Sequence, residues 1–308
     1  MQYKELSRRF RRFLARLGLQ FCSLTVTIIP QRFIYAFAHL LANIGYVVVS
    51  RHRKTAIESL SIAFGSEKSL QALKKIAFES FDAMAKSGVE FLVFLQKPYL
   101  INASVTVEGI EHLEWALAKK NGVIALSAHF GNFPLLLTKL AKDGYAIHTM
   151  LRHMRDQWVD DYFSQRRAAV GVGSIFTQPR KECVDKSLEV LRKNHILFMQ
   201  LDQNFGTGGI FVDFFGKKAA TAKGPIVFAL RTNAAIVPMF IFRENNNHQR
   251  IVIDPEVELI HGKDSDETIQ RNAQKLTAII ESYIRRYPAE WGWVHRRWKV
   301  RPKEEKKT

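Results

Sequence analysis

The sequence predicts an α/β protein with a central mixed sheet flanked by helices, preceded by an N-terminal helical segment that associates with a membrane. Three observations support this prediction: short apolar runs bounded by turn residues, helical periodicity between those runs, and an apolar stretch behind a basic N-terminus. Strands that alternate with helices indicate a sheet covered by helices. The 308 residues suffice for one main domain with an appendage. We therefore expect a membrane-anchoring segment at residues 1–50 and the main domain at residues 51–308.

The N-terminal stretch is apolar from residue 13 to residue 49, but polar residues and Pro30 divide it into two parts. Each part is shorter than the roughly 20 residues that a spanning helix needs. No small-residue cleavage site follows, so the segment reads as an uncleaved anchor rather than a signal peptide. Two helices in the membrane interface, or one that dips into the bilayer, fit this pattern. A pair of ordinary core helices is the alternative.

A long amphipathic helix is expected from about Leu70 to Leu95, where Pro98 ends the pattern. The remaining elements follow in alternation. Strands are expected at residues 122–128, 146–150, 196–202, 236–242 and 251–253, and helices at residues 132–142, 157–170, 181–193, 222–231 and 266–286.

The formal net charge of +17 favours a polyanionic partner, such as nucleic acid, anionic lipid or an acidic carrier protein. The basic residues gather before the apolar stretch and behind three tryptophans near the C-terminus, which suits a membrane interface. Solvated tails are the alternative for each cluster. No nucleic-acid-binding motif is present, so nucleic acid is not an expected partner. The two clusters are Lys4, Arg8, Arg9, Arg11 and Arg12, and Arg296, Arg297, Lys299, Arg301 and Lys303.

Two residues at predicted strand ends are candidates for catalysis. His129 follows the strand at residues 122–128, and Asn132 is placed to cap the next helix. A histidine there is suited to take a proton from a hydroxyl beside an anion-stabilising helix N-terminus, although a lone histidine is more often structural. Asp202 closes another strand. Ligands collect beyond the carboxyl ends of parallel strands, so both side chains are expected at one edge.

Other motifs argue against cofactors. The glycine-rich loop at residues 205–209 matches neither the dinucleotide fingerprint nor the phosphate loop. Cys22 and Cys183 lie far apart, without neighbours at metal-ligand spacing, so we expect no metal site and no disulfide.

Taken in order along the chain, short motifs resemble the lipid A late acyltransferases, the lauroyl and myristoyl transferase branch of the lysophospholipid acyltransferase superfamily. They include the AHFGN motif at residues 128–132 and the VDFFG motif at residues 212–216. The other matching segments are residues 53–60, 63–64, 151–152, 202–203, 220–221, 237–238, 285–288, 291, 293, 295–299 and 301–302.

The resemblance implies a single acyltransferase-type domain on the cytoplasmic face of the cell inner membrane. Such an enzyme moves a fatty-acyl group from acyl carrier protein, or coenzyme A, to a hydroxyl of a glycolipid such as a lipid A precursor, without a metal or redox cofactor. His129 would be the general base. The substrate-binding residues implied are Asn132, Arg152, Gln203, Phe215, Gly216, Thr221 and Pro238, the last at the floor of the pocket.

One position departs from the family pattern. The usual signature has an acidic residue five positions after the histidine, where this chain has Pro134. Proline cannot accept a hydrogen bond from imidazole, so another group must orient His129. Asp202 is our candidate, with water or a backbone carbonyl as alternatives. A non-catalytic glycolipid-binding relative, which kept the groove but lost turnover, is the competing hypothesis for function.

Overall fold

The computed structural model describes residues 2–262 and 265–302, without the side chains of residues 2–9 and 11. The predicted membrane contacts of Lys4, Arg8, Arg9, Arg11 and Lys303 therefore lie outside the described side chains.

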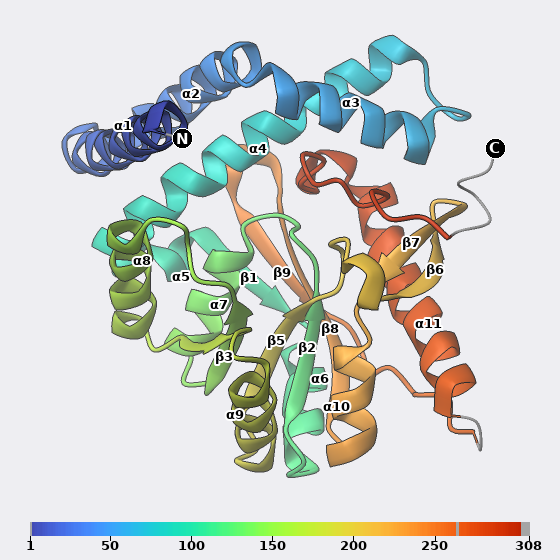
Figure 1. The fold of residues 1–308 in the computed structure, drawn as a ribbon. Helices are drawn as coiled ribbons and strands as arrows, with labels where there is room; N and C mark the ends of the chain where they lie inside the picture. The colour runs from blue at the N-terminus through green and yellow to red at the C-terminus, as the bar shows by residue number, and fades with distance from the viewer. Residues whose placement is uncertain (1, 263–264, 303–308) are drawn as a thin grey trace.

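A seven-stranded sheet forms the centre of the molecule (Figure 1), in the order β1-β9-β8-β2-β5-β3-β4. Neighbouring strands are parallel except β8 and β9, which are antiparallel. The predicted mixed sheet flanked by helices is thus confirmed. The strands are β1 (Val105–Glu108), β2 (Val123–Ser127), β3 (Ile147–Leu151), β4 (Gly173–Phe176), β5 (Ile196–Gln200), β8 (Ala235–Arg243) and β9 (Gln249–Ile253). A separate antiparallel hairpin consists of β6 (Ile210–Phe214) and β7 (Lys217–Thr221).

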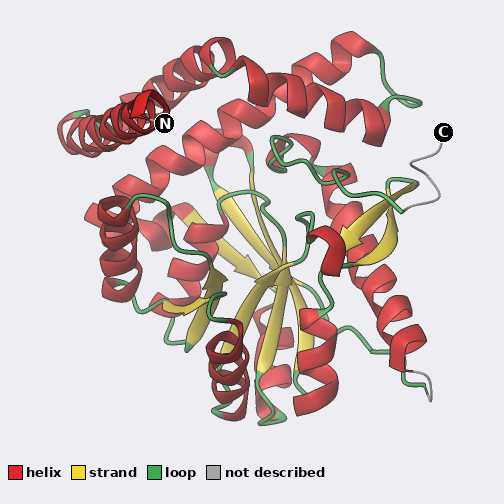
Figure 2. Ribbon diagram, in the orientation of Figure 1, coloured by secondary structure: helices red, strands yellow, loops and turns green. Residues whose placement is uncertain are grey.

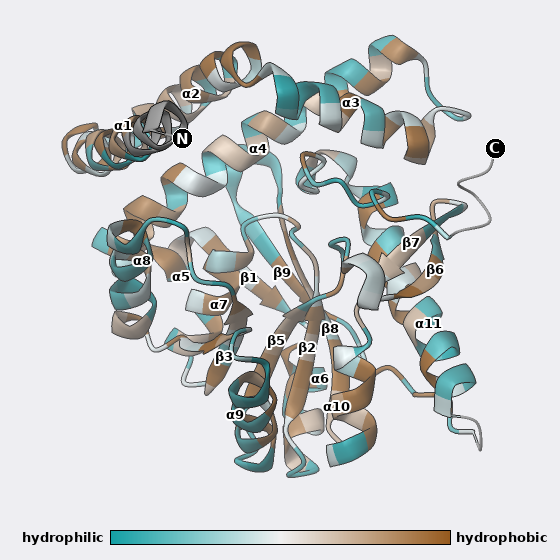
Figure 3. Cartoon of the chain, in the orientation of Figure 1, coloured by the Kyte–Doolittle hydropathy of each residue, from teal (hydrophilic) through white to brown (hydrophobic). Residues whose placement is uncertain are grey.

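Helices cover both faces of the sheet, as Figure 2 shows. They are α5 (Ile101–Ser104), α6 (Ile110–Ala118), α7 (Phe133–Lys142), α8 (Gln157–Ala169), α9 (Arg180–Arg192), α10 (Gly224–Thr232) and α11 (Ser265–Arg286). Along β2, Ile124 and Leu126 contribute to the core shared with α9, α10 and α11, while Val123 and Ala125 contribute to the core shared with α6 and α7. Alternate side chains point to opposite faces of a strand, so a strand buried on both faces is apolar throughout. The central strands are accordingly brown in Figure 3.

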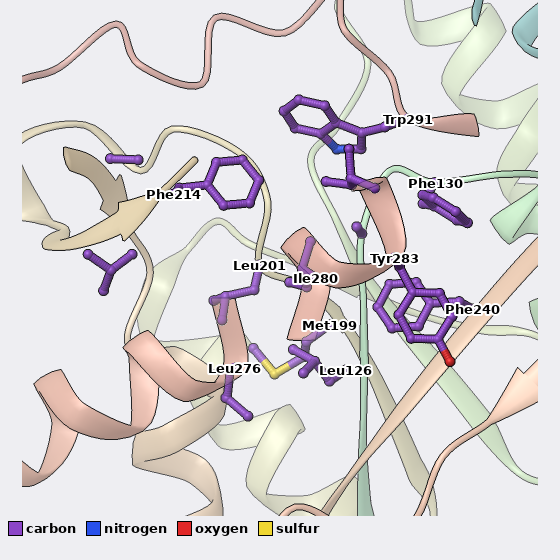
Figure 4. Close-up of a cluster of buried hydrophobic side chains, with 14 of the residues drawn as sticks. Leu126, Phe130, Met199, Leu201, Phe214, Phe240, Leu276, Ile280, Tyr283 and Trp291 are labelled. Atoms are coloured by element: carbon purple, nitrogen blue, oxygen red, sulfur yellow. The ribbon is translucent and has the colours of Figure 1, made fainter. Parts of the chain in front are cut away.

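The first core is rich in aromatic residues, and Figure 4 shows part of it. Phe130, Phe240 and Tyr283 bring together the segment after β2, the strand β8 and the helix α11. Trp291 lies above them, beside Phe214 of the hairpin. This core therefore anchors the C-terminal segment against the end of β2, where the candidate site lies.

Four helices form a layer along one side of the molecule (Figure 1): α1 (Gln2–Ile28), α2 (Ile34–Val48), α3 (Ser50–Phe64) and α4 (Leu70–Gln96). Val26 and Ala38 of the first two helices are buried with Val89 and Leu92 of α4. No single described helix is long and apolar enough to cross a membrane. Residues Gln31–Val48 and Ser50–Phe64, bent by 89°, meet the length and composition criteria only as a pair.

The sequence-based predictions of individual elements are confirmed, with ends that differ by at most two residues. The strands β1 and β4, the hairpin β6–β7 and the helices α3, α5 and α6 were not among the predicted elements. β1 and β4 have four residues each and lie at the two edges of the sheet. Segments this short carry almost no periodic signal.

Candidate active site

The register of two parallel strands brings His129 and Asp202 together. In the pairing of β2 with β5, Ser127 lies opposite Gln200. His129 and Asp202 each follow two residues after that pair, so both lie beyond the carboxyl edge of the sheet. A ligand-binding crevice is expected at this edge of an open α/β sheet.

Three hydrogen bonds hold the Asp202 carboxylate. Its Oδ1 lies 2.9 Å from Nδ1 of His129, and its Oδ2 accepts hydrogen bonds from the His129 backbone N–H at 3.0 Å and the Trp291 indole N–H at 2.8 Å. Asp202 is 1% exposed, whereas 27% of the His129 side chain is exposed. The carboxylate is therefore buried, whereas the His129 ring that it contacts is partly accessible to solvent.

Burial by itself raises the pKa of Asp202, because it penalises the charged form. The electrostatic interaction with His129 and the hydrogen bonds from His129 and Trp291 outweigh burial, so the pKa lies below its ordinary value of 3.8. The carboxylate is thus ionised at neutral pH, and it accepts a hydrogen bond from His129 when the ring proton is on Nδ1. This tautomer leaves Nε2 of His129 with a free lone pair, which is the form that a general base needs.

The loop after His129 approaches β8 closely. Gly131 has a φ of +56°, and a Cβ placed on it would lie 1.8 Å from the carbonyl oxygen of Ile241. Only glycine fits such a position without displacing the strand. The Gly131 N–H donates to the Glu290 carbonyl at 2.8 Å, and the Gly292 N–H donates to the His129 carbonyl at 3.1 Å. The C-terminal segment therefore holds the backbone on both sides of Phe130.

Gln203 lies beside the exposed face of His129. Its Nε2 is 2.9 Å from Nε2 of His129 and 3.4 Å from Nε2 of His295. The carbonyl of Gln203 accepts a hydrogen bond from Arg297 at 3.0 Å, and the same guanidinium donates to the Ala220 carbonyl and to the Thr221 hydroxyl. Arg297 is fully buried, and burial lowers its pKa to about 10. This arginine therefore ties the Gln203 loop to the hairpin.

The Asn132 side chain forms hydrogen bonds within the protein on both its oxygen and its nitrogen. Its side-chain oxygen caps α7 by accepting from the Leu135 N–H, and its Nδ2 donates to Glu90 at 2.9 Å. Glu90 is 2% exposed and forms a bidentate ion pair with Arg243, where one N···O distance is 2.9 Å. Further hydrogen bonds reach Glu90 from Tyr35 and Gln249, each at 2.9 Å. A buried polar network thus supports the start of α7, directly after the His129 loop.

His129 separates two cavities. The larger has a volume of about 650 Å³, within the range of small-molecule sites, and most of its wall is apolar. The smaller has a volume of about 230 Å³ and lies between α4 and the C-terminal segment. The two share Phe91, His129, Phe133 and Pro134.

The substrate-binding residues predicted from the resemblance lie in different places. Arg152, at the end of β3, lines the larger cavity together with Gln203, whereas Asn132 lines the smaller one. Phe215 and Gly216 form the turn of the hairpin, where Phe215 packs against Phe64 and Trp293.

Thr221 and Pro238 are buried in β7 and β8. Neither they nor Phe215 and Gly216 are among the described residues that line the two cavities. A substrate role for these four residues stays a prediction that no contact supports.

Sequence reasoning gave no role to Glu90 or His295. It placed Trp291 with the C-terminal basic residues at a membrane interface, and this was wrong, because Trp291 and Arg297 are fully buried. Trp291 and His295 fall in segments that carried the family resemblance, which was the available signal for them. Glu90 lies within the predicted helix but outside its apolar stripe, so nothing in the sequence indicated that its carboxyl group is buried. Among the described residues, no group of three or more His, Cys, Asp or Glu side chains is arranged to hold a metal ion.

Comparison with known proteins identifies the family. Residues 1–300 match the bacterial lipid A biosynthesis acyltransferase family. Lipid A biosynthesis palmitoleoyltransferase from Escherichia coli (strain K12) is 25% identical over 260 residues, which cover 82% of this chain and 81% of that protein. Lipid A biosynthesis lauroyltransferase from the same organism is 23% identical over 299 residues, with coverage of 95% and 93%.

Two further proteins are more distant. Phosphatidylinositol mannoside acyltransferase from Mycobacterium tuberculosis (strain CDC 1551 / Oshkosh) is 22% identical, with coverage of 62% of this chain and 59% of that protein. The crystal structure of the 1-acyl-sn-glycerophosphate acyltransferase PlsC from Thermotoga maritima aligns with a TM-score of 0.38 at 15% identity, covering 81% of this chain and 99% of that one. Because the family match spans residues 1–300 and the curated relatives are named acyltransferases, the chain belongs to the bacterial lipid A biosynthesis acyltransferase family and is an acyltransferase.

Proposed function

We propose that this enzyme transfers a fatty-acyl group from a thioester donor, acyl carrier protein or coenzyme A, to a hydroxyl of a glycolipid such as a lipid A precursor. The observation that carries the proposal is the His129–Asp202 pair beside a large apolar cavity. A buried carboxylate that orients an imidazole is the arrangement that activates a hydroxyl. The names of the relatives support a glycolipid acceptor.

In this mechanism Nε2 of His129 takes the proton from the acceptor hydroxyl as its oxygen attacks the thioester carbonyl carbon. The carbonyl oxygen becomes an oxyanion, which the N-terminal end of α7 stabilises through its dipole. Collapse of the tetrahedral intermediate breaks the C–S bond, and the imidazolium returns the proton to the departing thiolate. Asp202 stabilises the imidazolium throughout, in place of the acidic residue that Pro134 replaces.

Gln203 occupies the position that the acceptor hydroxyl needs. Its amide nitrogen lies 2.9 Å from Nε2 of His129, so the hydroxyl must displace it before proton transfer. We assign Gln203 the role of a hydrogen-bond donor to Nε2 of His129 in the free enzyme. The acceptor hydroxyl replaces it when the acceptor binds.

The larger cavity suits the acyl chain of the donor. Leu137, Met199 and Leu201 are among the apolar residues that line it, and they would replace water around the chain. Arg152 lines the same cavity at an exposed position. Its guanidinium is suited to the phosphate that both thioester carriers bear.

Membrane attachment is part of the proposal. On α1 an apolar stripe at helical spacing faces outward, with exposed fractions between 45% and 71%, and on α2 four apolar side chains are 52–73% exposed. Patches of this kind mark lipid or protein contacts. Exposed Arg12, Arg32 and Arg51 lie on or beside these helices and suit anionic headgroups on the cytoplasmic face of the inner membrane. The outward side chains are Phe10, Phe13, Leu14, Leu17, Phe21, Leu24 and Ile28 on α1, and Leu40, Ile44, Val47 and Val48 on α2.

Removal of residues 1–49 should release the chain, but it would also uncover Val89 and Leu92 of α4. A sharper test replaces Phe13, Phe21 and Leu24 with serine, which leaves the buried contacts in place. We expect the variant to stop floating with anionic lipid vesicles, whereas Leu70→Ser, which alters an exposed leucine on α4, should float like the wild type. Unchanged flotation of the triple variant would place the membrane contact elsewhere.

Mass spectrometry of lipids tests the activity itself. Cells that express the chain should contain a glycolipid heavier by one acyl group, and His129→Ala should abolish this species. A purified enzyme that transfers no acyl group from either carrier to any glycolipid or lysolipid acceptor would refute the proposal. A non-catalytic lipid-binding protein would instead leave the lipid profile unchanged by His129→Ala, but the enzymatic names of the relatives do not favour that alternative.

A further inference from the structure

The smaller cavity has a chemical character of its own. α4 contributes one wall through Ala83, Ser87 and Gly88, and the C-terminal segment contributes Glu290 and His295. His129 reaches it from the sheet edge, so the same imidazole is accessible from both cavities. A reaction that joins two substrates at one base needs two such approaches.

Polar side chains that line the smaller cavity are those of Glu290, His295, His129, Ser87 and Asn132. The Asn132 amide is already hydrogen-bonded to Glu90 and Leu135, so the carboxyl, the two imidazoles and the hydroxyl are the groups open to a ligand. The described residues that line it include no lysine or arginine, whereas Arg152 and Arg167 line the larger cavity. Carboxyl, imidazole and hydroxyl groups form hydrogen bonds with the hydroxyl groups of a ligand. They offer no cation to a phosphate, and a carboxylate repels one.

Glu290 contributes most to the preference of this cavity for hydroxyl groups over phosphate groups. One carboxyl oxygen accepts a hydrogen bond from the Arg243 backbone N–H at 3.3 Å. Burial raises the pKa of Glu290, and the nearby Glu90 carboxylate acts in the same direction, although Arg243 and Lys86 oppose both. A second anion would therefore meet either direct repulsion or the cost of protonating Glu290.

We infer that the smaller cavity binds the uncharged, hydroxyl-bearing part of the acceptor, a sugar or similar polyol, and that Glu290 excludes phosphorylated groups from it. This inference rests on the proposed function, because it assigns the acyl chain to the larger cavity and the acceptor to the smaller one. Any phosphate of the acceptor then lies outside the smaller cavity. Glu290 acts as a specificity-determining residue, since it selects the group that reaches His129.

Equilibrium binding without an acyl donor tests the inference independently of turnover. The probes are octyl glucoside and octyl glucoside 6-phosphate, both below their micellar concentrations. The wild type should bind the neutral sugar at least about tenfold more tightly. Glu290→Gln keeps an acceptor oxygen for the Arg243 N–H and should reduce this preference at least about fivefold. Glu111→Gln, which removes an exposed carboxylate on α6, is the control and should leave the preference unchanged.

A second variant tests where the sugar lies. Gly88 lines the smaller cavity, and a Cβ placed on it meets no atom within 4 Å, so Gly88→Leu narrows the cavity without a backbone clash. Octyl glucoside should bind at least about tenfold more weakly, while a dodecyl thioether of coenzyme A should bind as before. Gly18→Leu, at an equally open position on α1, should change neither.

Equal binding of the two sugars by the wild type, or a preference that Glu290→Gln leaves intact, would overturn the inference. It would also fail if Gly88→Leu blocked the thioether instead of the sugar. If the sugar preference follows our expectation but no acceptor is ever acylated, the cavity assignment stands as a binding site and the proposed transferase reaction falls.

Discussion

Replacement of Asp202 by asparagine tests whether its carboxylate sets the tautomer of His129. The carboxylate accepts three hydrogen bonds, one on Oδ1 from the ring and two on Oδ2 from the His129 backbone and Trp291. Asparagine has a single acceptor oxygen. If that oxygen keeps the two donors on the Oδ2 side, its NH₂ group faces Nδ1 of His129. The ring must then carry its proton on Nε2, which leaves no lone pair for the acceptor hydroxyl.

The expected loss follows from the role of the base. General-base catalysis contributes about 10²–10⁴-fold, equivalent to about 2.7–5.4 kcal/mol at about 1.36 kcal/mol per tenfold. The same aspartate-to-asparagine change behind the histidine of a serine protease costs about 10⁴-fold through the wrong tautomer. We therefore expect kcat to fall about 10²–10⁴-fold. KM should change less than about threefold, because Asp202 is not among the described residues that line either cavity.

Initial rates of transfer from a radiolabelled acyl thioester to a glycolipid acceptor measure this effect, and circular dichroism checks the fold. His129→Ala should cause a similar loss, and the double variant should lose little more than either single variant, because both remove one functional unit. Pro134→Glu restores the family spacing and should partly rescue Asp202→Asn. Full activity of Asp202→Asn beside an inactive His129→Ala would show that His129 works without a carboxylate. Additive losses in the double variant would also refute the pair.

Three further predictions concern stability. Glu90→Gln leaves the buried guanidinium of Arg243 without its counter-ion and should lower the free energy of unfolding in urea by about 3–5 kcal/mol. The control is Glu189→Gln, which breaks an exposed ion pair and should have almost no effect. Equal effects of the two variants would contradict a special role for the buried network. Gly131→Ala should lower the free energy of unfolding by at least about 2 kcal/mol, because Gly131 has a positive φ and its Cβ position is blocked by the backbone of Ile241. Gly18→Ala, at an open helical position, should be neutral or stabilising. A Gly131→Ala variant as stable as the wild type would contradict the close approach of this loop to β8. The pKa of Asp202 is lowered in the folded state, so its ionisation stabilises the fold above the unfolded pKa near 3.8 and this stability is lost as the pH falls through the lower folded pKa. The difference in thermal midpoint between the wild type and Asp202→Asn should thus be constant at neutral pH and shrink below about pH 4, and a difference independent of pH down to acid unfolding would oppose this.

Local patterns determined much of the fold. The strand β2 and the helix α7 were predictable because an apolar run next to an asparagine cap and a proline carries its own signal. The placement of His129 and Asp202 at one edge also followed from sequence, since both end buried strands. The hairpin of β6 and β7 was not predicted, because lysines and alanines in β7 lack the alternation that marks a strand.

The sequence alone determined the order of the main strands and helices, the two residues of the candidate pair and the family motifs. Only the tertiary structure decided how those residues are held. Trp291 reaches Asp202 from a position 89 residues away, and Glu90 meets Arg243 across 153 residues. It also placed Phe215 in a core instead of a cavity. Periodicity reports only which face of an element is buried, whereas partners so far apart in sequence are selected by the packing of whole elements against one another.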